Sequence, residues 1–156
     1  MANTGVVFGG DILLYENTGT EQAPVWAAFA HATSHSISES TNMREQAHKD
    51  DGGETLVKPG RHAAGTISIS GLVSYNGKDY HDLKDKRNKR EVVLFKYSGR
   101  PSADTDFIDA KEATGDKYEE GKGYISEISR EDPLDADSTY NCTITMSGVP
   151  VIKTVS

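Results

Sequence analysis

The side chains that could do chemistry in this sequence are few and widely separated. His31 and His35 lie four residues apart, which on a strand puts both on one side, but no carboxylate or cysteine nearby completes a zinc ligand set. Asp104, Asp106 and Asp109 resemble part of a calcium loop, yet the glycine and the bidentate glutamate of an EF-hand are missing. We therefore interpret this segment as a solvated acidic loop and expect no metal and no cofactor.

The candidates for nucleophilic or phosphate chemistry are equally weak. Cys142 is the only cysteine, and it lies in an alternating apolar stretch, which predicts a small buried side chain and excludes an intramolecular disulfide. The pairs Gly9-Gly10 and Gly52-Gly53 lack the strand-loop-helix spacing of a phosphate-binding loop. No Gly-x-Ser-x-Gly elbow is present. Nothing in the sequence argues for an enzyme, and we expect a non-enzymatic protein.

Composition sets further limits on function. A chain of 156 residues fits one domain, which we place over residues 1–156. The net charge of −7 is opposite in sign to the basic surface with which proteins grip nucleic acid. The sequence predicts no membrane insertion, because no apolar run approaches the roughly 18 residues of a membrane span. The first residues carry no pattern of a secretory signal, so we expect synthesis and assembly in the cytoplasm of the producing cell.

The elements that must position any site are mainly strands. The pattern predicts strands over residues 10–16, 25–30 and 34–41, with the first two paired across the turn-rich residues 17–20. Residues 34–41 alternate around Ile37, which indicates a half-exposed strand. A strand over residues 91–97, apolar on both faces, and a closing hairpin of residues 123–130 and 140–151 complete the expected sheet.

Two strands show strict alternation between an apolar face and a face of small hydroxyl side chains. In residues 64–75, Ile67, Ile69, Val73 and Tyr75 share the apolar face, and residues 140–151 repeat the pattern. The second face carries almost no Lys or Glu, unlike an ordinary solvated surface, which indicates a special environment. The residues of this second face that we select as candidates are Thr66, Ser68, Ser70, Thr143 and Thr145.

One helix is expected, over residues 80–90, with Asp79 as its N-cap. Tyr80 and Leu83 are three residues apart and can dock on the sheet together. The basic residues that follow complement the helix dipole, which we favour over a phosphate or DNA site. Two long polar excursions, residues 42–60 and 100–117, interrupt the pattern; we expect the first to be a loop or extended hairpin that a neighbouring subunit holds.

The order of these elements resembles the major tail tube protein family of siphophages and related gene transfer agents. The resemblance is carried by the early strand pair before residues 36–42, the polar excursion that ends in Arg61-His62-Ala63-Ala64-Gly65-Thr66-Ile67-Ser68-Ile69-Ser70-Gly71, and the central helix before residues 92–97. It is also carried by Gly123-Tyr124-Ile125-Ser126 and by the ending Tyr140-Asn141-Cys142-Thr143-Ile144-Thr145-Met146-Ser147-Gly148. Residues 100–117 match nothing in that pattern.

The resemblance implies a β-sandwich or partly open barrel with one short flanking α-helix and long loops. It implies a virion protein whose copies form six-membered rings that stack into a tail tube, through which DNA passes without sticking. Expected partners are other copies of the chain and the tail tip, tape measure and tail terminator proteins. On this reading the hydroxyl face lines the lumen, and the axial contact between rings falls on Met43, Arg44, Glu45, Gln46, His48, Lys49, Asp50, Asp51 and Glu54.

Two other classes compete with this reading. A tube subunit of a contractile or type VI secretion-type injection system would share the architecture. A monomeric small-molecule-binding β-barrel would need more large apolar side chains around a pocket than 35% hydrophobic and 8% aromatic residues readily supply.

Overall fold

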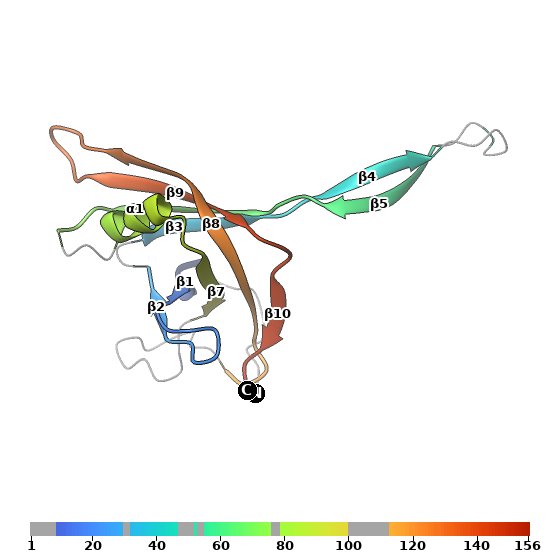
Figure 1. Ribbon diagram of the computed structural model, residues 1–156, viewed down its shortest axis with the longest axis horizontal. Coiled ribbons are helices and arrows are strands. Elements are labelled where there is room, and N and C mark those ends of the chain that lie inside the picture. Colours follow the sequence, from blue (N-terminus) through green and yellow to red (C-terminus); the bar gives the residue numbers. More distant parts are fainter. Residues whose placement is uncertain (1–8, 30–31, 47–51, 53–54, 76–78, 100–112) are drawn as a thin grey trace.

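The computed structural model describes residues 9–29, 32–46, 52, 55–75, 79–99 and 113–156. Within these residues the protein is mainly β, with one α-helix (Figure 1). None of the helices described is long and apolar enough to cross a membrane. A short 3-10 turn, Gly9–Asp11, precedes the first strand. The strands are β1 (Ile12–Asn17), β2 (Trp26–Ala28), β3 (Ala32–Ser38), β4 (Thr41–Gln46), β5 (Leu56–His62), β6 (Thr66–Leu72), β7 (Val93–Gly99), β8 (Lys117–Glu131), β9 (Thr139–Met146) and β10 (Val151–Thr154).

The main sheet is antiparallel and open, with the strand order β2-β1-β7-β8-β9-β6-β3. Strand β10 lies outside this order and pairs with β8. The expected pairing of the first two strands is confirmed by the register of Tyr15 with Ala28. The prediction of an interior strand after the helix is also confirmed, because β7 lies between β1 and β8. This is the mainly β architecture that the sequence predicted.

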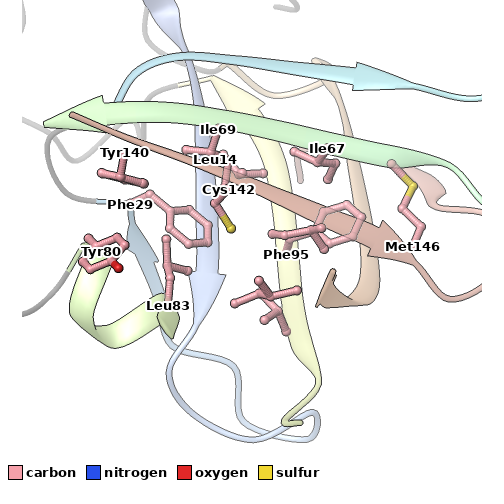
Figure 2. Packing of buried hydrophobic residues seen from close by; sticks show 13 residues of the cluster. Leu14, Phe29, Ile67, Ile69, Tyr80, Leu83, Phe95, Tyr140, Cys142 and Met146 are labelled. Atoms are coloured by element: carbon pink, nitrogen blue, oxygen red, sulfur yellow. The ribbon is translucent and has the colours of Figure 1, made fainter. Parts of the chain in front are cut away.

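The core lies on the apolar face of β6 and β9, as their alternation predicted. Ile67 and Ile69 are buried and stand opposite Ile144 and Cys142. Figure 2 shows these side chains converging with aromatic residues from other elements, including Phe95 of β7. The alternation ends earlier than expected, because β6 stops at Leu72 and Tyr75 is fully exposed. The strand predicted over residues 140–151 likewise ends early: β9 stops at Met146, and Gly148 adopts a positive φ of 86° where the chain turns toward β10.

The helix α1 (Tyr80–Lys89) covers part of this core. Tyr80 and Leu83 are its buried residues, as predicted from their spacing. Lys86, two-thirds of the way along the helix, forms an ion pair with Glu16 of β1, and both side chains are largely buried. The pair fixes the helix to β1, and burial lowers the pKa of Lys86.

Asp79 occupies the N-cap position but does not cap the helix with its side chain, so that part of the prediction was wrong. Its buried carboxylate instead accepts a hydrogen bond of 2.8 Å from the backbone N–H of Ser74. The side chain therefore holds the end of the β6 segment against the start of the helix. Its negative charge also adds to the effect of burial in raising the pKa of Tyr140 to about 12.

Strand β8 is longer than predicted and takes part in two regions of the fold. Its first half pairs with β7 on one edge and with β10 on the other, as the register of Glu120 with Lys96 and with Val151 shows. From Gly123 onward it pairs with β9. The sequence pattern showed only the second half, because residues 117–122 lack the apolar alternation of a half-buried strand.

The excursion after β3 is an extended hairpin that projects from the rest of the molecule (Figure 1). Strands β4 and β5 form a separate two-stranded sheet, and we call these two strands the arm. The backbone N–H of Ala63 donates to the carbonyl of Ser40 at 2.9 Å, which joins the arm to the β3–β6 pair. The sequence allowed either a loop or an extended hairpin for this segment, and the structure has the hairpin.

Candidate functional site

The hydroxyl face predicted on β6 and β9 exists as one continuous surface. The register pairs Thr66 with Thr145 and Ser68 with Thr143, so four of the five predicted residues stand directly opposite one another. The fifth, Ser70, faces Asn141 and donates a hydrogen bond of 2.6 Å to its side-chain oxygen. These side chains are half-buried or exposed, whereas their neighbours in sequence point into the core.

The neighbouring strands extend this face beyond the residues that sequence reasoning selected. Ser34, Ser36 and Ser38 of β3 pair with Ser70, Ser68 and Thr66. The signal was present in the sequence as serine at every second position of 34–38, but the half-exposed strand gave no second apolar residue to fix its phase. On the other side the second half of β8 adds the following side chains, of which two are acidic and none is basic: Tyr124, Glu127, Ser129 and Glu131.

The opposite face of the same strands is closed by the core. Cys142, predicted to be a small buried residue, is 1% exposed, and burial raises the pKa of its thiol to about 12. A thiol held protonated in this way is a poor nucleophile, so the residue packs and does not react. The two faces of β6 and β9 therefore differ: one carries hydroxyl side chains, and the other packs in the hydrophobic core.

Two strand edges bordering this face have no partner among the described residues. Strand β3 ends the order of the main sheet and pairs only with β6. Residues 124–131 of β8 pair only with β9, because β7 leaves β8 at Gly123. Unpaired edges of this kind are templates for pairing with another chain. The face thus begins and ends at an edge that a second copy could extend.

The arm exposes apolar side chains to solvent. Met43 is 61% and Val57 57% exposed, and they lie on the same face of the ribbon, because Met43 pairs with Pro59 and Val57 with Glu45. The other face carries Arg44 directly opposite Lys58, with Leu56 beside them. Like charges in direct opposition destabilise an isolated ribbon, and two strands alone are only marginally stable in water.

The structure covers part of the predicted axial contact. Met43, Arg44 and Glu45 lie on β4 of the arm with exposed side chains, and Gln46 ends that strand. His48, Lys49, Asp50, Asp51 and Glu54 lie outside the described residues.

Titratable groups gather beside the first half of β8. The side chain of Glu119 has a raised pKa, caused first by burial and then by the negative charge of Glu39. Tyr97, directly opposite Glu119, has a raised pKa for the same two kinds of reason, and its hydroxyl lies 3.2 Å from the ring nitrogen Nδ1 of His35. This cluster is polar packing at the border of the core. It brings no nucleophile or base into a substrate pocket.

The described residues contain no group of three or more His, Cys, Asp or Glu side chains that could hold a metal ion. Of the two histidines considered for zinc, His35 instead contacts Tyr97, and His31 lies outside the described residues. The acidic residues considered for calcium, Asp104, Asp106 and Asp109, also lie outside them.

An open antiparallel sheet with unpaired edges, a hydroxyl-rich face and a projecting arm defines a class of β-rich assembly subunit. The model of the family described as phage tail tube protein matches residues 6–152, and the chain belongs to this family. No curated protein sequence matches the chain significantly.

Solved structures of tubes share the fold at low sequence identity. The tail of an empty gene transfer agent particle, refined with C6 helical symmetry, superposes with a TM-score of 0.70 at 15% identity, over 95% of this chain and 99% of that one. The SPP1 tail tube gives a TM-score of 0.69 at 11% identity, over 97% and 81%. The sheath-tube complex of an extracellular contractile injection system gives 0.63 at 12% identity, over 92% and 88%.

Proposed function

We propose that this protein is the structural subunit of a phage tail tube, that its copies close into six-membered rings, and that the rings stack around a channel for DNA. The observation that carries the proposal is the hydroxyl face bounded by two unpaired strand edges. A head-to-tail contact between such edges closes a ring when the rotation is right. The family membership and the C6 symmetry of the gene transfer agent tail support the same arrangement.

The hydroxyl face is the surface that we assign to the channel. Thr66, Ser68, Ser70, Thr143 and Thr145 were expected there, and the three serines of β3 belong to the same surface. Small uncharged hydroxyl groups offer no cation to a phosphate, and the chain as a whole is acidic. Since binding to DNA draws mainly on contacts between basic side chains and phosphates, DNA would slide along such a wall without being held.

The ends of the tube would meet other proteins of the tail. Solved structures of similar fold include a tube-terminating cap and a baseplate of the anti-feeding prophage. These likenesses support partners at both ends of the stack, in the positions expected for a tail tip and a terminator. On this proposal the protein is assembled in the host cytoplasm, carries no enzymatic activity and reaches its final place in the tail of the virion.

A tube subunit of a contractile injection system is the second candidate. The likeness to the extracellular contractile injection system favours it specifically, because that structure is a sheath-tube complex. The two candidates share ring and tube and differ in whether the outer surface binds a sheath. Co-expression with a sheath protein of a contractile injection system, followed by electron microscopy, would separate them.

Negative-stain electron microscopy of the purified protein at low and high concentration tests the proposal most directly. Rings at low concentration and hollow tubes at high concentration are the expected result. A monomer at every concentration that binds a small molecule saturably would contradict it and favour the ligand-binding barrel.

The channel assignment has its own test. Lysine introduced singly at Ser68, Thr143 or Ser36 should leave tubes intact and slow DNA ejection, because each six-membered ring would gain six cations facing the phosphates. The slowing should weaken as the salt concentration rises. Lysine at Asp135, on the exposed turn between β8 and β9, is the matched control and should leave ejection unchanged. Normal ejection in all three face variants would contradict the assignment.

A further inference from the structure

Large exposed apolar side chains concentrate in two separate places on the molecule. One is the arm, with Met43, Leu56 and Val57. The other is a surface groove of about 410 Å³ that Trp26 of β2, Leu94 of β7 and Val151 of β10 line together with Val149. Val149 and Val151 are 57% and 58% exposed, and their neighbours Val25 and Ile152 are also exposed. We call this cavity the outer groove.

The arm of a molecule cannot fill the outer groove of that same molecule. Figure 1 shows the arm projecting from the β3–β6 pair, away from β2 and from β10, between which the groove lies. Each copy therefore carries one apolar ribbon and one apolar groove that it does not bring together. A contact between two different surfaces of the same chain repeats from copy to copy, and it builds a ring or a filament.

The charges of the two surfaces also match. Glu45 is the only charged residue on the apolar face of the arm, where it stands beside Met43, Val57 and Pro59. The outer groove contains Lys122, which has no carboxylate partner among the described residues, whereas its neighbour Glu120 is paired with Lys153 at 2.6 Å. Apolar contact would supply most of the attraction, and one opposite charge pair would fix the register of the ribbon.

We propose that the apolar face of the arm, formed by Met43, Glu45, Val57 and Pro59, docks in the outer groove of a second copy in the tube, with Glu45 against Lys122. This inference rests on the proposed function and names the surface that receives the arm. Docking would also explain how the arm is stable. An isolated pair of strands is only marginally stable in water, and the contact would bury the apolar side chains of the arm.

Cysteine cross-linking tests the contact in assembled tubes. The native Cys142 is buried and held as a thiol, so introduced cysteines provide the only reactive groups. Tubes of the double variant V57C/V149C should give, on oxidation, a ladder of covalent oligomers on a non-reducing gel. The single variant V57C can give dimers at most, because each chain then has one new thiol.

The matched control is V57C/L134C, in which the second cysteine lies on the acidic turn after β8, where Leu134 is 98% exposed. This position is more accessible than the groove, so collisions without specific docking would favour it. A ladder from V57C/V149C at least several-fold stronger than from the control supports the proposal. A ladder from V57C/L134C alone, or from neither variant in intact tubes, overturns it.

A charge exchange provides a second test that does not depend on oxidation. The single variants E45K and K122E should each raise the concentration at which tubes appear by about five- to tenfold, as loss of one interfacial pair of roughly 1 kcal/mol implies. The double variant E45K/K122E should return it to within about twofold of wild type. Failure of the double variant to recover overturns the docking. Absence of rings and tubes from the wild-type protein instead overturns the proposed function.

Discussion

The β3–β6 pair and the arm, which extends from it, use their strands in different ways. In β6 every second residue is buried, and the register with β9 aligns isoleucine with isoleucine. In the arm, the described side chains of both faces are largely exposed. Its two strands pair only with each other. The first region is stabilised within one chain. The second, on our proposal, is stabilised by contact with another copy.

The difference shows where stability and assembly can be separated. We call the main sheet and α1 the body. Substitutions in the body should lower the stability of the monomer, and substitutions in the arm should act on assembly, because the arm contributes few buried contacts to the monomer. Four predictions test whether this division holds.

Deletion of residues 44–54 should have the largest effect, which is complete loss of tubes. The monomer should keep its circular dichroism spectrum, with a melting temperature within about 4 °C of wild type, because none of the described residues of this segment belongs to the core. Electron microscopy and thermal denaturation measure the two quantities. Loss of the fold in the deletion variant would show that the arm supports the body, and the contrast would then fail.

Phe95→Ala should lower the free energy of unfolding by about 3–5 kcal/mol, because Phe95 is fully buried and its ring packs against Gly121. Val57→Ala on the arm is the control and should change stability by less than about 0.5 kcal/mol. Urea denaturation of the two monomers gives both values. Equal losses would contradict the division between body and arm.

Asp79→Ala should lower the free energy of unfolding by about 1–3 kcal/mol, since it removes the buried acceptor for the half-buried N–H of Ser74. Asp79→Asn keeps an acceptor oxygen and should cost less than the alanine variant. The same urea measurements test the order, and an alanine variant as stable as wild type would show that the carboxylate is dispensable.

Glu119→Gln should have the smallest effect, a gain of less than about 1 kcal/mol at pH 7. The folded pKa of Glu119 is raised, so its ionised form destabilises the fold at pH values above the unfolded pKa. The advantage of glutamine should shrink as the pH falls through the raised pKa of the folded state and vanish below 4.5, the ordinary pKa of a glutamate side chain. Melting temperatures from pH 3 to pH 8 check this, and an advantage independent of pH would point to packing instead.

The sequence predicted the body better than its borders. Alternation in residues 64–75 and 140–151 was sufficient to assign the core and hydroxyl faces, because one-sided burial leaves a period of two in the sequence. Tyr80 and Leu83 were placed on the sheet for a similar reason. Burial patterns of this kind are local, and so they can be read without knowing which strands meet.

The features that the sequence did not show depend on contacts between distant residues. Residues 118–122 of β8 were assigned to no element from the sequence, because Glu119 and Glu120 belong to the strand only through their pairing with β7 and β10. The side-chain role of Asp79 depends on Ser74 across a turn rather than on the helix that follows. The outer groove could not be predicted either, because its walls come from five strands, some of them far apart in the chain.

The hydrogen bond between Ala63 and Ser40 has a mechanical consequence. It makes the arm and the β3–β6 pair one long ladder, whose hydrogen bonds run across the direction of the strands. A force that pulls the arm lengthwise draws both strands of this ladder in the same direction, so it loads the bonds between β6 and β9 in shear, all together, instead of opening them one after another. Tension on the arm is carried straight into the centre of the subunit, where β6 lies between β3 and β9.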